Sequence, residues 1–229
     1  MLRRLGLDVI RWPVGTSVAV DFVSVAEKTS ADVVVDVGAN IGDFAVAVRA
    51  RGFPGRIVSF EPGSTSGATL VARASRDARW DVYRMALGDK QEELTLNVPV
   101  ATDLASFLPV SNRGEDHFAE HLATVRSETV QVERLDAIWD TMVGGDRAMV
   151  KVDTQGWERH VLEGASGVLD RIVGLQVELS VNSYYDGAPD YLEMLAWLRE
   201  LGFSPTWFHP ISWHDGSLGE IDCVLCRAG

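Results

Sequence analysis

Cysteine is scarce in this chain of 229 residues, which contains only Cys223 and Cys226. Two cysteines cannot form the disulfide framework of a small secreted domain, and free thiols suit a reducing compartment. They stand three positions apart in a segment with the pattern of a strand, so we expect their side chains on opposite faces, as core thiols rather than metal ligands. These features favour a cytoplasmic location.

Long apolar runs are also lacking, since no stretch approaches the roughly 18 apolar residues of a membrane span. In the N-terminal segment 1–30, Asp8, Arg11 and Asp21 interrupt each apolar stretch before it reaches the length of a signal-peptide core. Residues 16–28 have the spacing of a capped helix that packs on a sheet, with a basic amphipathic arm on a membrane surface as the alternative. The sequence predicts no transmembrane segment.

Positive charge is in the minority, with 21 Lys and Arg against 33 Asp and Glu and a net charge of −12. Nucleic-acid binding depends largely on Lys and Arg that neutralise phosphates, so this balance argues against a nucleic-acid partner. The length suits one α/β domain over residues 1–229, and no internal repeat divides it. The sequence carries no sign of the oligomeric state.

A buried strand followed by a glycine turn occupies residues 33–44. The run Val33–Val37 has the pattern of a strand buried on both faces, and Gly38 and Gly42 would let a ligand approach the backbone. The next helix begins at once and offers free N–H groups. A dinucleotide fingerprint requires glycine where Asn40 stands, so a diphosphate is disfavoured, whereas the acid Asp36 before the turn would attract an ammonium.

A second carboxylate, Glu61, ends the next apolar run, 61 − 36 = 25 residues after Asp36. A carboxylate at the tip of the second strand is well placed to hold a ribose diol by two hydrogen bonds. An ammonium, a ribose and no phosphate together describe S-adenosylmethionine, which we expect as the cofactor.

Five segments, in order, resemble the FkbM-type family of S-adenosylmethionine-dependent methyltransferases. They are Asp36–Gly42 (DVGANIG), Phe60–Pro62 (FEP), Ala86–Asp89 (ALGD), Lys151–Glu158 (KVDTQGWE) and Gly202–Phe203. The resemblance implies the class I methyltransferase fold, a Rossmann-like, doubly wound, mostly parallel seven-stranded sheet with an antiparallel last strand. It also implies O-methylation of a sugar, glycolipid or other secondary metabolite. The family often has Val-Glu-Gly after Lys-x-Asp, where this chain has Thr154-Gln155-Gly156.

The resemblance assigns the cofactor to the glycine turn and to the ends of the next two strands. Asp36 and Gly38 are expected at the methionine end, Asn40 and Gly42 at the turn, and Glu61 at the ribose. The complete set of expected cofactor residues is Asp36, Gly38, Ala39, Asn40, Gly42, Glu61, Pro62, Met85, Ala86 and Leu87. The last three would contact the adenine.

Asp153 ends another apolar run, and its carboxylate should face the same crevice as Asp36, because ligands in open α/β sheets lie beyond the carboxyl ends of the strands. We therefore expect Asp153 to accept or orient the proton of a substrate hydroxyl, with a cap of the next helix as the alternative. Glu178, at the end of the following strand, is the second catalytic candidate. The residues expected to contact substrate are Ser106, His117, Tyr184, Tyr185 and His209.

Residues 91–98 and 128–133 alternate apolar and polar positions, which predicts an antiparallel pair at the sheet margin. The long polar insertion between them, 99–127, is expected to be a substrate lid. It contains His117-Phe118-Ala119-Glu120-His121, a match to the H-x-x-E-H pattern of inverted zincins. A zincin places this motif on a long packed helix with a third ligand, so we interpret it as a helical turn that faces solvent or substrate, and expect no metal.

The remaining pattern alternates strand and helix, which indicates right-handed crossovers in a parallel sheet. Strands are predicted at 33–37, 57–61, 81–86, 148–153, 172–179, 203–208 and 220–227, and helices at 42–51, 65–77, 135–142, 157–169 and 189–201. Two further interpretations stay open at this point: an NAD(P)-dependent dehydrogenase, and a binding protein that keeps the cofactor cleft without turnover.

Overall fold

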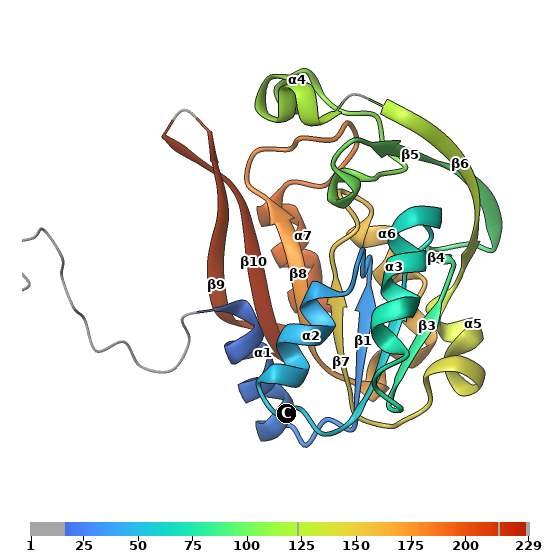
Figure 1. The fold of residues 1–229 in the computed structure, drawn as a ribbon. Helices are drawn as coiled ribbons and strands as arrows, with labels where there is room; N and C mark the ends of the chain where they lie inside the picture. Colours follow the sequence, from blue (N-terminus) through green and yellow to red (C-terminus); the bar gives the residue numbers. More distant parts are fainter. Residues whose placement is uncertain (1–16, 123, 215, 228–229) are drawn as a thin grey trace, which may run out of the picture.

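Seven strands form the main sheet in the order β3-β2-β1-β7-β8-β10-β9 (Figure 1). The computed structural model describes residues 17–122, 124–214 and 216–227, so the segment 1–16, for which no signal peptide is expected, lies outside the described residues. The strands are β1 (Val33–Val37), β2 (Arg56–Phe60), β3 (Trp80–Tyr83), β7 (Ala148–Val152), β8 (Ile172–Ser180), β9 (Phe203–His214) and β10 (Ser217–Arg227). Neighbours pair in parallel, except that β10 is antiparallel to β8 and β9. The predicted sheet with a reversed last strand is confirmed.

Helices cover both faces of this sheet (Figure 1). One face is covered by α1 (Val18–Lys28), α2 (Asp43–Ala50) and α3 (Ser64–Ala74), and the other by α5 (Leu135–Ile138), α6 (Glu158–Glu163) and α7 (Tyr191–Glu200). Two predicted helices, 135–142 and 157–169, change type along their length, because α5 continues as the π-helix η4 (Trp139–Val143) and α6 is followed by the 3-10 helix η5 (Ser166–Arg171). No helix in the described part of the chain is long and apolar enough to cross a membrane.

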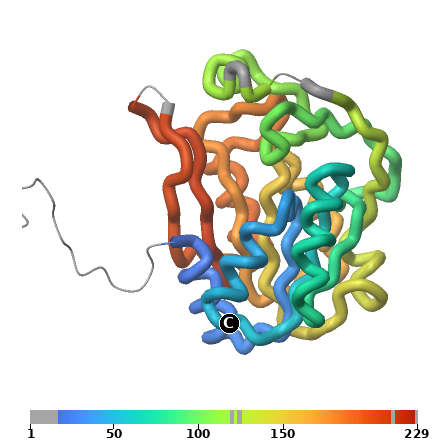
Figure 2. Tube along the Cα trace, in the orientation of Figure 1, coloured from blue at the N-terminus to red at the C-terminus, as the bar shows by residue number. Residues whose placement is uncertain are grey.

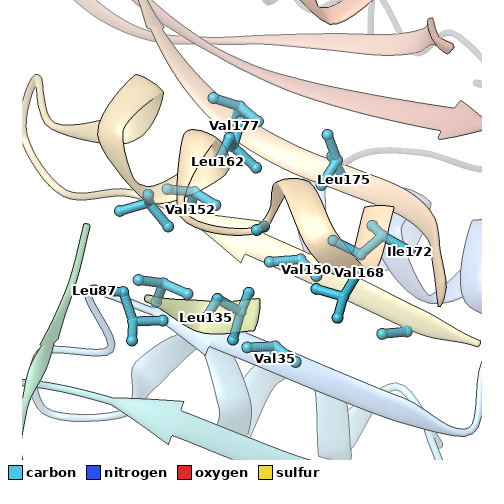
Figure 3. Packing of buried hydrophobic residues seen from close by; sticks show 14 of the residues in the cluster. Val35, Leu87, Leu135, Val150, Val152, Leu162, Val168, Ile172, Leu175 and Val177 are labelled. Carbon is cyan, nitrogen blue, oxygen red and sulfur yellow. The ribbon is translucent and has the colours of Figure 1, made fainter. Parts of the chain in front are cut away.

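The core lies on both sides of the sheet because successive strand residues point to opposite faces. Val35 and Val150 pack against the α5–α7 side, as Figure 3 shows, whereas Val34 and Met149 pack against the α1–α3 side. All five residues of β1 are buried, as its continuous apolar run predicts.

A second sheet of three strands stands apart from the main one. It has the order β4-β6-β5, with β4 (Ala86–Leu87), β5 (Glu92–Pro99) and β6 (Thr124–Glu133), and its own small core around Leu96 and Val132. The predicted antiparallel pair is confirmed, but its placement at the margin of the main sheet is wrong. The predicted strand 81–86 is also divided, because the chain leaves the main sheet after Tyr83 and β4 pairs with β6 instead.

The insertion 99–127 is structured where the sequence predicts a long loop. It holds η2 (Thr102–Leu104), α4 (Asn112–Phe118) and η3 (Ala119–Leu122). Single β-bridges join Asn97 to Ser106 and Val110 to Tyr185. Figure 2 accordingly shows the segment around α4 beside the orange segment that follows β8. The first half of the insertion is thus tied both to β5 and to the segment that follows β8.

The last two strands are longer than predicted and run through the expected connection Pro210–Gly219. The register between the two strands shifts on either side of Glu220. The prolines of β9 are tolerated because β9 is an edge strand. Cys223 belongs to the core on the α7 side, whereas Cys226 packs against the core on the α1 side. The predicted opposite orientation of the two thiols is confirmed.

Candidate active site

A cavity of about 340 Å³ lies at the carboxyl ends of the parallel strands. Its volume is within the usual range for a small-molecule site, roughly 300–1,000 Å³. Its wall is made by Val18, Val37, Gly38, Ala39, Asn40, Ile41, Asp43, Phe44, Phe60, Glu61, Pro62, Met85, Ala86, Leu87, Leu96, Thr102, Asp103, Ala105, Ser106, Phe107, Lys151, Asp153, Thr154, Gln155, Trp157, Gln176 and Asp222. Eight of the ten predicted cofactor residues are on this wall, and Asp36 and Gly42 are not.

The turn after β1 is held in an unusual backbone conformation. Gly38, Asn40 and Gly42 have φ values of 72°, 45° and 90°. A Cβ atom on Gly38 would lie 1.9 Å from the carbonyl oxygen of Asp153, and one on Gly42 would lie 2.7 Å from Leu70. Both glycines are therefore required by the packing of the chain on itself, a reason additional to the ligand clearance inferred from the sequence.

Glu61 fixes this turn from the end of β2. Its Oε2 accepts a hydrogen bond from the N–H of Asn40 at 2.8 Å, and its Oε1 accepts from the N–H of Gly63 and the hydroxyl of Ser66, both at 2.8 Å. Burial raises the pKa of Glu61, and these donors act in the opposite direction. Because Oε2 accepts only one of these three bonds, it keeps acceptor capacity toward the cavity. Its predicted contact with a ribose stays a prediction.

Asp36 has a partner within the chain rather than an open position on the cavity. It is fully buried, with Oδ1 at 3.4 Å from Nζ of Lys151 and Oδ2 accepting from the hydroxyl of Ser59 at 3.4 Å. Burial raises its pKa, and Lys151 opposes that shift. The structure thus connects Asp36 to the cavity through Lys151, an arrangement different from the expected direct contact with an ammonium.

Lys151 is a site residue that the sequence reasoning missed. Its Nζ donates to the carbonyl oxygen of Gly38 at 2.9 Å and lies 3.3 Å from Oδ2 of Asp153. Burial acts to lower its pKa, but the carboxylates of Asp153 and Asp36 outweigh burial and raise it. The available signal was a lysine inside the otherwise apolar run of β7, where an unpaired charge would be costly.

Asp153 lies on the cavity wall with its side chain about 33% exposed. Its Oδ1 accepts from Nε2 of Gln155 at 3.1 Å, while Oδ2 faces Lys151. The alternative interpretation of Asp153 as a helix cap is wrong, because Glu158 accepts the N–H groups of Thr154 and Gly156 at 2.8 and 3.1 Å. Asp153 is therefore held by two donors while part of its surface faces the cavity.

Glu178, the second catalytic candidate, lies behind Gln155 and outside the cavity wall. Its Oε1 accepts from Nε2 of Gln155 at 3.2 Å, and the hydroxyl of Tyr185 donates to Oε1 of Gln155 at 2.9 Å. Burial, followed by the charges of Asp153 and Glu220, raises the pKa of Glu178 well above its usual value. Glu178 is connected to the cavity wall through Gln155 and through the neighbouring Asp222 on β10.

Of the five predicted substrate residues, Ser106 is on the cavity wall, where its hydroxyl donates to the carbonyl oxygen of Gln155 at 2.7 Å. His117 stacks on Tyr184 with ring centroids 4.5 Å apart, and Tyr184 and Tyr185 are buried. His209 lies 2.9 Å from Asp21 and joins β9 to α1. The structure does not bring these last four residues to the cavity wall.

The H-x-x-E-H motif is divided between two short helices. His117 lies in α4, which ends at Phe118, and His121 lies in the 3-10 helix η3. The motif therefore does not occupy the long packed helix on which a zincin carries its two histidines.

Two further residues of the cavity wall, Gln176 on β8 and Asp222 on β10, were also missed. Gln176 is 3% exposed, and its side chain acts to lower the pKa of Asp222. Burial, followed by the nearby Asp153 carboxylate, raises the pKa of Asp222 to about 7. The signal of Gln176 and Asp222 in the sequence was weaker than that of Lys151, because β8 also contains Glu178 and β10 also contains Glu220.

The strand order, the reversed β10 and the cavity over the turn after β1 define a class I methyltransferase fold. Among solved structures, the chain is similar to TehB from Haemophilus influenzae, with 8% identity, a TM-score of 0.50, and coverage of 93% of this chain and 64% of that one. It is also similar to an rRNA methylase from Streptococcus thermophilus, with 10% identity, a TM-score of 0.49, and coverage of 97% and 100%. At such identities the likeness concerns the fold alone.

The sequence profile of the methyltransferase FkbM domain matches residues 36–205, about three quarters of the chain. The chain belongs to the FkbM methyltransferase family, and its cofactor is S-adenosylmethionine. A search among curated proteins gives no match. Family membership replaces the dehydrogenase interpretation that the sequence left open.

Proposed function

We propose that this protein transfers the methyl group of S-adenosylmethionine to a hydroxyl oxygen of a sugar, glycolipid or other secondary metabolite. The observation that carries the proposal is Asp153, a carboxylate on the cavity wall that is oriented by Lys151 and Gln155. A cytoplasmic location and a small-molecule rather than nucleic-acid acceptor belong to the same proposal, in keeping with the two free cysteines and the net charge of −12.

The residues of the cavity fit this cofactor. One end, which we call the cofactor end, is formed by Gly38, Asn40, Glu61 and residues 85–87. It offers an apolar surface at Met85, Ala86 and Leu87 for an adenine ring, and acceptor capacity on Glu61 for a ribose. We call the adjoining part of the wall, formed by Asp153, Gln176 and Asp222, the acceptor end. The two ends meet at Lys151, whose Nζ contacts both Gly38 and Asp153.

When bound, the cofactor supplies an electrophilic methyl group on a positively charged sulfur. The protein then has to orient the acceptor oxygen and receive its proton, and orientation is the larger contribution in such a displacement. Asp153 is the group that would receive the proton, since its carboxylate faces the cavity. Lys151 and Gln155 fix its position, and they also prevent it from turning away from the acceptor.

The insertion 99–127 is proposed to be a lid over the cavity. The hydroxyl of Thr102 donates to Oδ1 of Asn40 at 3.1 Å, and Ser106 bonds to the backbone at Gln155. These two contacts reach the two ends of the cavity, so a displacement of the insertion would open both ends together. Closure would exclude water from the reacting groups.

The test has two stages. Calorimetric titration should show binding of S-adenosylhomocysteine and no binding of NAD(P). A labelled methyl donor should then transfer label to a member of a panel of sugars, glycolipids and hydroxylated metabolites, and the label should be stable as an ether. Affinity for NAD(P) alone, or label found only on nitrogen or carbon, would contradict the proposal.

A further inference from the structure

The acceptor end brings together polar groups from three strands. Asp153 follows β7, Gln176 lies in β8 and Asp222 lies in β10, and all three are on the cavity wall. Pairing between strands explains the arrangement, because Gln176 lies opposite Lys151 and Asp222 opposite Glu178. The side chains therefore come from the same face of the sheet, the face covered by α1 and α2.

The charge of the cavity wall is strongly negative. Its ionisable residues are the five acids Asp43, Glu61, Asp103, Asp153 and Asp222 and the single base Lys151. An ammonium has three N–H donors, and those of Lys151 already face oxygens of Gly38, Asp36 and Asp153. On the described cavity wall, no cation is left to bind a phosphate, sulfate or carboxylate of a ligand.

The acceptor end also has a hydrogen-bond acceptor that lacks a donor. Oε1 of Gln176 has no hydrogen-bond partner among the residues that the structure describes. Gln176 is 97% buried (3% exposed), so this oxygen is an acceptor removed from bulk water. A buried acceptor without a donor costs about 1–3 kcal/mol, and a ligand N–H or O–H would remove that cost.

We propose that the acceptor molecule carries a primary ammonium group close to the hydroxyl that is methylated, and that Asp222 and Oε1 of Gln176 bind this ammonium. The acceptor class is then an amino sugar or another amino alcohol. The inference rests on the proposed function and specifies its substrate. An ammonium supplies both the positive charge that the carboxylates lack and the N–H donor that Gln176 lacks, whereas a neutral hydroxyl supplies only a donor.

The experiment uses three sugars that share a ring and differ in charge: glucosamine, glucose and glucuronate. The protein is first saturated with S-adenosylhomocysteine, and each sugar is then titrated at neutral pH and low ionic strength. We expect glucosamine to bind at least about tenfold more tightly than glucose, as a charge-assisted hydrogen bond does over a neutral one, and glucuronate to bind most weakly.

Asp222→Asn tests the assigned residue and should bring the ratio of glucosamine affinity to glucose affinity close to one. Glu200→Gln is the matched control, because it makes the same change of charge at an exposed position of α7 and should keep the preference. The comparison of sugars on the unaltered protein does not depend on the stability of either variant.

The outcomes separate this inference from the proposed function. Failure of S-adenosylhomocysteine to bind would refute the proposed function itself. Normal cofactor binding with no preference for glucosamine, including no sugar binding at millimolar concentrations, would overturn the ammonium site alone. Equal or tighter binding of glucuronate would have the same meaning, as would a preference for glucosamine that survives in Asp222→Asn.

Discussion

The two ends of the cavity are built from different kinds of groups. At the cofactor end, backbone N–H groups and one carboxylate, Glu61, satisfy one another through bonds of 2.8 Å. At the acceptor end, side chains of β7, β8 and β10 leave a buried oxygen of Gln176 without a donor and a surplus of negative charge. Each carboxylate oxygen of Glu61 at the cofactor end already accepts a hydrogen bond from the chain, whereas Oε1 of Gln176 at the acceptor end accepts none from the residues that the structure describes.

This difference indicates how the two ends contribute to binding. A preorganised site costs little ordering on binding, so its affinity depends on the geometry of the turn. A site with unbalanced polar groups gains most from the ligand that balances them, and therefore discriminates among ligands. We expect changes at the cofactor end to act on affinity for the cofactor, and changes at the acceptor end to act on turnover and substrate choice.

The largest expected effect is at the turn after β1. In Gly38→Ala, the new Cβ would lie 1.9 Å from the backbone oxygen of Asp153, and φ would stay at 72°. The turn has to move, and we expect S-adenosylhomocysteine affinity to fall by about a thousandfold, or about 4 kcal/mol, in calorimetry. Gly52→Ala is the control, because Gly52 also has a positive φ but no atom within 4 Å of an added Cβ. Equal affinity in the two variants would remove the distinction between a rigid and an adaptable end.

Asp153→Asn should act on the other end. The amide keeps the shape but cannot accept a proton, so kcat should fall by at least about a hundredfold. Affinity for S-adenosylhomocysteine should stay within a few-fold, and circular dichroism should confirm the fold. Loss of cofactor affinity with normal turnover at saturating cofactor would place Asp153 at the cofactor end instead.

Glu61→Gln should weaken the cofactor end by a smaller amount. The side chain then has one acceptor oxygen for donors that approach from Asn40 and from Gly63 and Ser66, so one bond is lost and an N–H group faces another donor. We expect a loss of about 1.5–3 kcal/mol in cofactor affinity, roughly tenfold to a hundredfold, with kcat at saturation nearly unchanged. Unchanged affinity would contradict the ribose assignment.

The pH dependence of the free energy of unfolding should show that the surroundings of Asp222 disfavour its negative charge. The pKa of Asp222 is raised to about 7 in the folded protein, so its stabilising contribution is present below the unfolded pKa and is lost as the pH rises through about 7. Asparagine does not ionise, so Asp222→Asn should gain about 1–2 kcal/mol relative to the unaltered protein between about pH 5 and pH 8. Urea unfolding at both pH values measures this change. If the two proteins differed in free energy of unfolding by the same amount at both pH values, the folded protein would not raise the pKa of Asp222.

The smallest expected effect concerns the lid. Thr102→Val removes the hydrogen bond to Asn40 while keeping the side-chain shape, which should cost about 0.5–1.5 kcal/mol of lid closure. Hydrogen exchange in 99–122 should become faster, and KM for cofactor should rise a few-fold. Exchange that is as slow as in β1 without ligand, in both proteins, would contradict a lid.

The sequence was sufficient for the main sheet because its central strands are largely apolar runs. It also predicted that Glu61 and Asp153 lie on one cavity, because both follow such runs directly; their roles there stay predictions. It was insufficient where distant segments meet. Lys151, Gln176 and Asp222 come from strands that are neighbours only in the folded sheet, so their shared surroundings are not visible along the chain. The division of 81–86 has a similar cause, since Ala86 of β4 pairs with Val132 of β6, which is 132 − 86 = 46 residues further along the chain.

The pairing of β5 with β6 also bears on how the substrate range of such a protein can change over evolution. The two strands pair from Glu92 with Val132 to Pro99 with Thr124, so the insertion is a loop whose ends are fixed by its own small sheet. The entropy of closing a loop grows slowly with length, by about 0.6 kcal/mol for each doubling. Loop-closure entropy therefore sets little limit on the length of the insertion. The part of the cavity wall that the insertion supplies, which includes Thr102 and Ser106, can change while the glycine turn and Glu61 stay under a separate and stricter constraint.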